Sequence, residues 1–245
     1  MSWISKTFSS SIGRKIIMSL TGLFLCSFLV VHLIGNLQLF KNDDGVAFNI
    51  YSHFMGTNPV IRTVEWLLVL GFGFHIYESW LLARRNKTAR GTDYVVNHSE
   101  QNSRWQSRNM GLLGTIILIF LLVHLYNFFW RARFGDLDPD INNNADLYTL
   151  VVSSFHQWWY VALYVLAQVA LCYHLLHGFR SSFQTLGLNH RKYTPAIQKI
   201  GYAFSVIVCL GFAIMPLYFF FFTNEQGQPV SAIAPLVDSI NLALR

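Results

Sequence analysis

Four histidines carry the most specific chemical signal in this chain of 245 residues, because each lies inside a separate long apolar segment. They are His32, His75, His124 and His174. An imidazole in hydrocarbon needs partners for its polar nitrogens, so ionisable residues in membrane segments are rare and usually functional. Two neutral imidazoles from neighbouring helices can fill both axial positions of a haem iron. Four such ligands therefore predict two haem sites.

The composition predicts a membrane protein. Apolar residues make up 53% of the chain and charged residues 12%, against a charged share of about 25% in soluble domains. We expect an all-α integral membrane protein that forms one domain over residues 1–245. Segments of roughly 20 apolar residues can cross a bilayer, and five are found, at about 16–40, 60–83, 110–130, 157–179 and 200–222. The first is too long for a signal peptide and contains His32, so we expect the mature protein to keep it.

The distribution of Lys and Arg predicts the orientation. Basic residues concentrate before the first span, between the second and third, and between the fourth and fifth, whereas one of the other connections is rich in Asp. By the positive-inside rule the N-terminus is cytoplasmic and the C-terminus lies outside. The basic inner face could also dock an acidic soluble partner, and nucleic-acid binding is not expected. Segments 43–58 and 232–244 are expected to form short helices at the outer interface.

The four histidines fall into two pairs by depth. Counted from the nearest basic residue at 1.5 Å per residue, His32 and His124 lie about 25 Å from the inner boundary. His75 and His174 lie about 9–14 Å from the same boundary. An upright bundle of four helices then offers one pair in each of two layers. We expect four of the five spans to surround two stacked haems.

A weak internal repeat links the first and third spans. Its members are Gly22, Phe28, Val31, His32 and Leu33, which recur at a constant offset as Gly114, Phe120, Val123, His124 and Leu125. Each glycine precedes its histidine by about 15 Å of helix. A bare backbone there would let a flat macrocycle approach, but small residues also pack helices together in membranes. Both interpretations of the two glycines remain open.

The cysteines indicate how haem would be held. The chain has no C-x-x-C-H motif, so the haems are expected to be bound non-covalently, as haem b. Cys26, Cys172 and Cys209 lie within spans without disulfide or zinc-ligand spacing, and we expect them only to pack.

Several short motifs together resemble one family. They are S-L-T-G at 19–22, V-V-H-L at 30–33, F-H-I-Y-E at 74–78, V-H-L-Y at 123–126 and H-x-x-x-G-F-R-S at 174–181. The chain resembles, over nearly its whole length, the five-helix, two-haem cytochrome b anchor of succinate:quinone oxidoreductases. The resemblance implies that His32 and His124 ligate the distal haem and that His75 and His174 ligate the proximal haem. This is the pairing that the depths predict.

The resemblance also implies a function in respiratory electron transport. Such an anchor has no active site for succinate. It sits in the bacterial cytoplasmic membrane, holds a flavoprotein subunit and an iron-sulfur subunit on the cytoplasmic face, and passes electrons between them and a membrane quinone, generally menaquinone. Some two-haem fumarate reductases carry a glutamate two residues before the last haem histidine. Here that residue is Cys172, which puts a proton route through this helix in doubt.

Three residues near the inner layer are candidates for contacts with the proximal haem. Ser19 and Arg180 lie where its carboxylates should emerge, and a hydroxyl and a guanidinium could bind them. Arg180 fits equally well as a positive-inside anchor. His177 is either a further propionate contact or a histidine at the headgroups.

Other polar and aromatic residues have two interpretations each. His53 could donate a hydrogen bond to quinone near the outer layer, or be an ordinary loop histidine. Glu78 could face haem, but we expect it to pair with Arg84 or Arg85 on its own helix. Aromatic residues at 158–160 and Trp66 are expected to form interfacial belts.

Two other classes of protein could present such histidines. One is the dihaem subunit of another respiratory enzyme, such as a nitrate reductase or hydrogenase. The other is a transporter with a histidine proton relay, which would show broken helices and acids beside the histidines. Pro216 is the only proline deep in a span, which disfavours the transporter.

Overall fold

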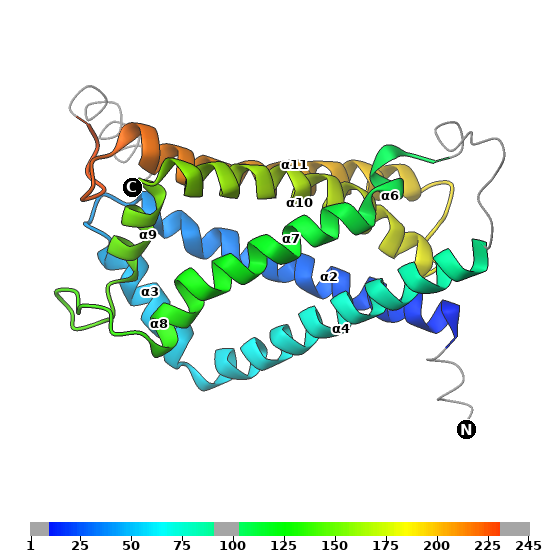
Figure 1. Cartoon of the computed structure of the whole chain (residues 1–245), viewed down its shortest axis with the longest axis horizontal. Helices are drawn as coiled ribbons and strands as arrows, with labels where there is room; N and C mark the ends of the chain where they lie inside the picture. Colours follow the sequence, from blue (N-terminus) through cyan, green and yellow to red (C-terminus); the bar gives the residue numbers. More distant parts are fainter. Residues whose placement is uncertain (1–9, 91–102, 231–245) are drawn as a thin grey trace. The chain divides into compact units, whose positions relative to one another are not determined.

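The computed structural model describes residues 10–90 and 103–230. In this part of the chain the regular structure is helical, apart from two isolated β-bridges. The elements, labelled in Figure 1, are α2 (Ser11–Asn36), the 3-10 helix η1 (Leu37–Phe40), α3 (Val46–Thr57), α4 (Pro59–Arg90), α6 (Trp105–Arg108), α7 (Met110–His124), the π-helix η2 (Leu125–Trp130), α8 (Arg131–Phe134), α9 (Leu147–Phe155), α10 (Trp158–Thr185) and α11 (Thr194–Phe222).

Within the described residues, five helical segments are long and apolar enough to cross a membrane. They are Ser11–Phe40, Pro59–Thr88, Met110–Phe134, Trp158–Thr185 and Thr194–Phe222. Each corresponds to one of the expected spans, and most begin earlier or end later because the helix continues into polar sequence beyond the apolar run. The expected all-helical architecture is therefore confirmed, and the five helices have the length and composition of a multi-pass membrane protein.

Contacts within the chain divide it into two compact units. Unit 1 comprises residues 1–29, 64–115 and 170–207, and unit 2 comprises residues 30–63, 116–169 and 208–245. The boundaries fall inside α2, α4, α7, α10 and α11, so each long helix contributes one segment to each unit. His75 and His174 belong to unit 1, whereas His32 and His124 belong to unit 2.

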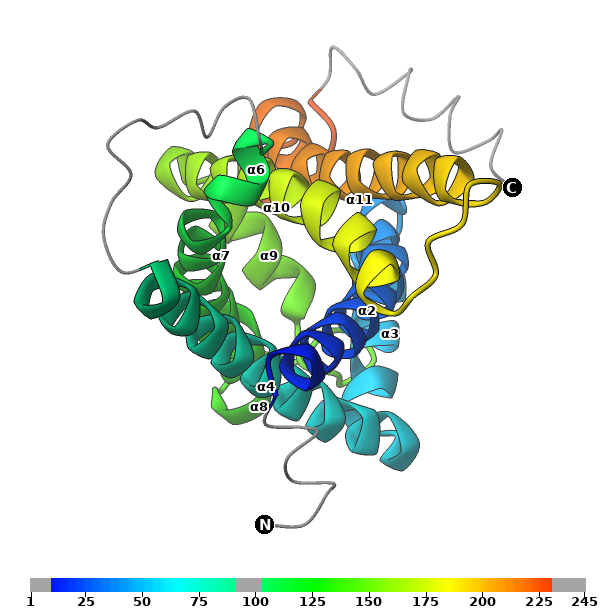
Figure 2. The same ribbon diagram turned by 90° about the vertical axis from the view of Figure 1, so that its right-hand side faces the viewer.

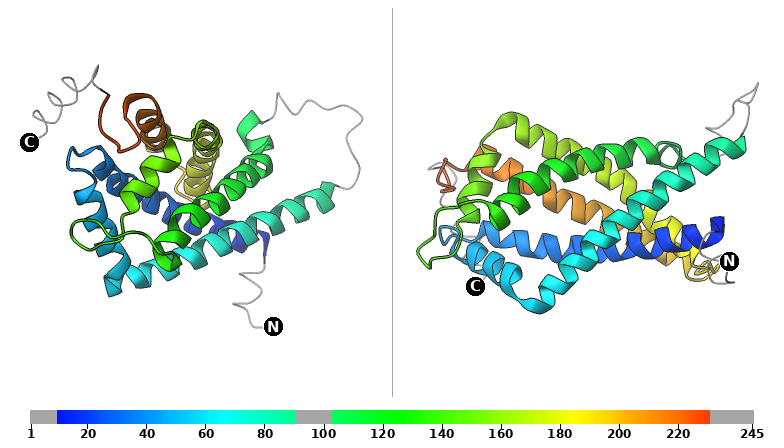
Figure 3. Two further views of the ribbon diagram at one scale, coloured as in Figure 1. Left: turned by 60° about the vertical axis from the view of Figure 1, so that its left-hand side comes forward. Right: turned by 60° about the horizontal axis from the view of Figure 1, so that its bottom comes forward.

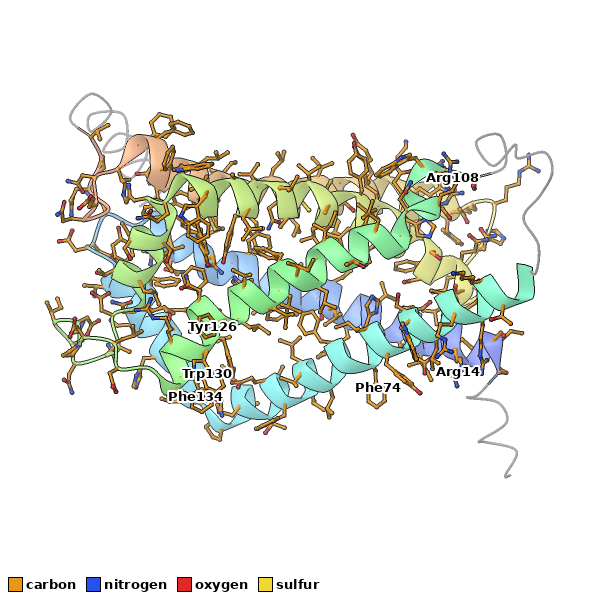
Figure 4. All side chains as sticks on the ribbon, viewed as in Figure 1. Arg14, Phe74, Arg108, Tyr126, Trp130 and Phe134 are labelled. Carbon is orange, nitrogen blue, oxygen red and sulfur yellow. The ribbon has the colours of Figure 1, made fainter. Side chains whose placement is uncertain are left out.

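In unit 1 the near ends of α2, α4, α7 and α10 surround a common interior (Figure 2). A T-shaped contact between Phe28 and Phe72 joins α2 to α4 at 6.4 Å between ring centroids. Apolar side chains on the other faces of α4 remain exposed, as expected for a lipid-facing helix. Phe74, for example, is 53% exposed and points away from α2 (Figure 4).

Unit 2 contains a buried apolar core built by η1, α3, α9, α10 and α11. Its buried members are Leu39, Phe48, Tyr148, Val151, Val152, Phe155, Tyr160, Val161, Tyr164, Met215 and Phe219. The short helices α3 and α9 contact each other (Figure 3). Gly45, at φ 82°, precedes α3, and a Cβ at this position would overlap the Tyr148 ring.

A buried amide fixes the start of α9. Asn49 on α3 is only 2% exposed and donates from Nδ2 to Oδ1 of Asp146 at 3.0 Å. Its Oδ1 accepts from the backbone N–H of Tyr148 at 2.9 Å, while Asp146 accepts from the N–H of Thr149 as the N-cap of α9. Two otherwise unpaired helix N–H groups are satisfied in this way. The short helix expected over 43–58 is thus observed as α3, whereas segment 232–244 lies outside the described residues.

Candidate metal centres

Unit 2 brings together the two histidines that the sequence places farthest from the inner boundary of the membrane. His32 lies on α2, and His124 is the last residue of α7. Their ring centroids are 5.8 Å apart, and the ring planes cross at 84°. Aromatic rings enclose the pair, with Phe212 at 5.5 Å from His32 and Phe120 stacked at 5.6 Å on His124.

Unit 1 brings together the other two histidines. His75 on α4 and His174 on α10 have ring centroids 6.2 Å apart, with ring planes at 65°. Nδ1 of His174 is buried and has no hydrogen-bond partner among the described residues. Buried polar atoms nearly always have a partner, and leaving one without costs about 1–3 kcal/mol. The orphan nitrogen therefore fits a site that receives a further group.

Both separations fit two imidazoles on one iron. Two metal–imidazole bonds of about 2.0–2.1 Å and two ring radii of about 1.1 Å put the centroids about 6.3 Å apart when the ligands face each other. No group of three or more His, Cys, Asp or Glu residues that could hold a metal ion occurs in residues 10–90 and 103–230. A haem iron needs only two protein ligands because the porphyrin supplies the others. Two histidines at each site are the number of protein ligands that such an iron takes.

Both glycines of the repeat lie at the pair in unit 1. A Cβ at Gly22 would lie 3.3 Å from Cε1 of His75, and one at Gly114 would lie 3.9 Å from Cε1 of His174. The sequence associates these glycines with the histidines that follow them on the same helix. Ten residues of helix cover about 15 Å, close to the expected difference in depth between the two pairs. Each glycine therefore meets a histidine ring of the other pair, carried by a neighbouring helix.

Sequence reasoning missed the residue that hydrogen bonds His124. The hydroxyl of Tyr164, on α10, lies 2.9 Å from Nδ1 of His124. Longer contacts are found at Nδ1 of two other imidazoles. Oγ1 of Thr21 lies 3.3 Å from Nδ1 of His75, and Nδ2 of Asn36 lies 3.4 Å from Nδ1 of His32. Both distances exceed the usual range of 2.7–3.2 Å for a hydrogen bond.

The Tyr164 contact continues into a chain of polar groups. The hydroxyls of Tyr164 and Tyr160 are 3.1 Å apart, and Nδ2 of Asn127 donates to the Tyr160 oxygen at 3.0 Å. The same nitrogen donates to Oγ of Ser154 at 3.1 Å. Tyr160 is only 4% exposed, so its assignment to an interfacial belt was wrong. Trp158, by contrast, is 70% exposed, as expected. The sequence signal for this contact was the i, i+4 spacing of Tyr160 and Tyr164, which places the two side chains on one face of a helix.

The structure gives mixed results for the proposed propionate contacts. Ser19 is 4% exposed, but its hydroxyl donates to the Lys15 carbonyl at 2.8 Å, so a propionate would have to displace that bond. Arg180 is exposed and lines a small cavity of about 80 Å³ with Gln184 and Asn189. His177 is half-buried. A polar side chain not anticipated from the sequence, Ser182, lies 3.9 Å from the Cβ position of Gly22.

Glu78 pairs with a different helix from the one expected. Arg14 on α2 donates from Nη1 to both carboxylate oxygens, at 2.9 and 3.1 Å. The two side chains are only 14% and 7% exposed. Arg84 instead lies over the ring of Trp80, at 4.8 Å from its centroid. The expected pairing within α4 was wrong because contact with α2 brings a closer cation to the carboxylate.

Two histidines outside the two pairs, His53 and His156, belong to unit 2. His53 is exposed on α3. The ring of His156 contacts the Asn224 carbonyl at 2.7 Å and lines an open polar cavity of about 640 Å³ with Asp44, Tyr148 and Glu225. Burial, together with Tyr218 and the nearby carboxylates, raises the pKa of Tyr148 to about 12. None of the four paired histidines lines this cavity.

Comparisons with known proteins add nothing to these observations. No protein-family model, no curated protein and no solved structure matches this chain. The chemistry of the site must therefore be argued from its residues.

Proposed function

We propose that this chain is the dihaem cytochrome b anchor of a succinate dehydrogenase or fumarate reductase complex. One observation carries the proposal. Two separate imidazole pairs, one in each unit, have ring centroids 5.8 and 6.2 Å apart, close to the separation of about 6.3 Å expected for two imidazoles on one iron. When bound, each haem b supplies one-electron transfer, at a potential tuned by its ligands and their hydrogen bonds.

The chain's own residues fix the iron ligands from different helices. His32 and His124 would hold the distal haem, and His75 and His174 the proximal haem. The aromatic rings around His32 and His124 exclude water from the ligands, and such an apolar surround is one of the ways a protein tunes redox potential. The chain would carry no residue that reacts with succinate, since the soluble subunits do that chemistry.

Charge supports an assignment of the two sides of the membrane. Both of the basic connections after α4 and after α10 belong to unit 1. The positive-inside rule puts these connections on the cytoplasmic side, where the flavoprotein and iron-sulfur subunits would dock. Quinone, expected to be menaquinone, would react within the membrane, and His53 remains a candidate for contact with it. The motifs shared with the cytochrome b anchors support the choice of enzyme class.

The decisive experiment is a haem count on the purified complex, with His32, His75, His124 and His174 changed to Ala one at a time. We expect two haems b per chain by the pyridine haemochrome assay. His32→Ala and His124→Ala should remove the same component of the reduced-minus-oxidised spectrum, and the other two variants should remove the other. His190→Ala, an exposed histidine, is the matched control and should keep both haems.

Succinate itself distinguishes the enzyme classes. In the intact complex, succinate should reduce haem in the native protein, and the flavoprotein and iron-sulfur subunits should co-purify with it. A complex without haem, or four alanine variants with unchanged spectra, would reject the dihaem assignment. Co-purification with subunits that oxidise hydrogen or reduce nitrate would keep the haems but reject the succinate assignment.

A further inference from the structure

We propose that Tyr164 is a positioning residue for the distal haem ligand, and that it sets the potential of that haem alone. The inference rests on the proposed function, because it assumes that His124 ligates iron. Its basis is the hydrogen-bonded chain from His124 through Tyr164, Tyr160 and Asn127 to Ser154, all within unit 2.

The far end of this chain fixes the orientation of the Asn127 amide. The Ser154 hydroxyl donates to the Leu150 carbonyl at 2.7 Å, so its oxygen accepts from Asn127. Asn127 must therefore present its NH₂ group, and the same group donates to the Tyr160 oxygen. The amide orientation is thus determined by its partners and not by an arbitrary choice between O and N.

The near end follows from ligation. Tyr164 occupies Nδ1 of His124, which leaves Nε2 as the nitrogen available to iron. A neutral imidazole that binds metal through the lone pair of Nε2 carries its proton on Nδ1. That Nδ1–H donates to the Tyr164 oxygen, and the Tyr164 hydroxyl can then donate to Tyr160. The Tyr160 oxygen then accepts from Tyr164 on one side and from Asn127 on the other.

This arrangement has a consequence for the iron. A hydrogen bond from the second ring nitrogen fixes the orientation of a ligating histidine and raises its basicity as a ligand. A more basic ligand stabilises oxidised iron, so the Tyr164 contact lowers the potential of the distal haem. In the proximal pair Nδ1 of His174 has no partner among the described residues, and Tyr164 belongs to the unit that holds the distal pair. Tyr164 should therefore act on one haem only.

The π-helix provides independent support for a built site. Asn127 lies in η2, which begins directly after His124. Segments of π-helix are rare and occur frequently at functional sites. The π-helix η2 lies between α7 and α8, and from it Asn127 reaches both Ser154 and Tyr160.

The test is a redox titration of both haems in the intact complex carrying Tyr164→Phe. We expect the ratio of reduced to oxidised distal haem, at the native midpoint potential, to rise about tenfold, by analogy with the smallest effect that loss of an outer partner has on metal affinity or activity. For a one-electron couple this is a shift of about 59 mV. Tyr160→Phe keeps the Tyr164 hydroxyl and should give a smaller shift of the same haem in the same direction.

Tyr126→Phe is the matched control. Tyr126 lies in the same π-helix but is 71% exposed (Figure 4), and its variant should leave both potentials unchanged. If the effect of Tyr160 passes through Tyr164, the double variant should shift no more than Tyr164→Phe alone.

The outcomes separate the inference from the proposed function. A native complex without haem overturns both. Two haems in the native protein with unchanged potentials in Tyr164→Phe, or an equal shift of both haems, overturn only the role of Tyr164. If Tyr164→Phe loses the distal haem, the result with Tyr160→Phe tests the inference instead. A shift in the potential of the distal haem supports the role of Tyr164, and an unchanged potential overturns it.

Discussion

Gly22→Ala should weaken haem binding at the proximal pair without weakening the fold. The new Cβ would lie 3.3 Å from Cε1 of His75, against an optimal carbon separation of about 3.5–4.0 Å. The ring must therefore retreat by a few tenths of an ångström. An imidazole bound to iron cannot follow, because metal-ligand distances tolerate only about 0.2 Å. The new Cβ and the haem iron therefore require different positions of the His75 ring.

The size of the effect follows from these distances. Overpacking of this kind costs about 1–3 kcal/mol, and about 1.4 kcal/mol is tenfold in a binding constant. Haem affinity at His75 and His174 should therefore fall about tenfold. Replacing a helical glycine by alanine also adds up to about 1 kcal/mol of helix stability, so the thermal unfolding midpoint of the haem-free protein should not fall.

Gly114→Ala is the matched control for this experiment. Its Cβ would lie 3.9 Å from Cε1 of His174, an ordinary van der Waals contact. Both variants are expressed with limiting haem, purified and compared by haem content per chain and by reduced-minus-oxidised spectra. Gly22→Ala should lose the proximal component and Gly114→Ala should keep it. Equal haem content in the two variants, or loss of the distal component from Gly22→Ala, would refute the reasoning.

Two further predictions concern stability and can be checked by thermal unfolding in detergent. Glu78→Leu leaves the Arg14 guanidinium buried without its carboxylate, which should lower the free energy of unfolding by about 3–5 kcal/mol. Adding Arg14→Met should recover part of that loss. A double variant less stable than Glu78→Leu alone would contradict a buried ion pair. Asn49→Ala removes the partner of Asp146 and of the first turn of α9, so it should lower the free energy of unfolding by about 1–3 kcal/mol. Asn142→Ala, at an exposed position, should leave stability unchanged. Equal effects of the two substitutions would argue against this role of Asn49.

The parts of the fold that the sequence predicts are those governed by local composition. Uninterrupted apolar length predicts each span, since a helix satisfies its own backbone hydrogen bonds in lipid. The depth of each histidine along its helix also predicts which histidine rings lie together, because the rise per residue is fixed. His32 lies near His124, and His75 near His174, as the counting suggests.

The details that the sequence did not predict depend on contacts between helices. Glu78 was assigned a partner on its own helix, because sequence spacing reveals only neighbours within an element, and α2 supplied Arg14 instead. Tyr160 was assigned to the interface because aromatic residues near span ends usually lie there. Its burial depends on how α10 packs against α9 and η2, which composition does not encode. The glycine repeat was visible, but which ring each glycine meets was not.

The π-helix within the third span separates two rotational registers in one continuous helix. Each α-helical residue turns the chain by about 100°, so one additional residue per turn rotates everything that follows. Before η2 the register directs His124 toward His32, and after it the register directs Arg133 toward the Gly56 carbonyl, to which it donates at 3.0 Å. Gain or loss of one residue in 125–130 would re-aim the arginine while the imidazole keeps its direction. Insertions and deletions here can therefore remodel the loop-facing end of the helix independently of the ligand that precedes it.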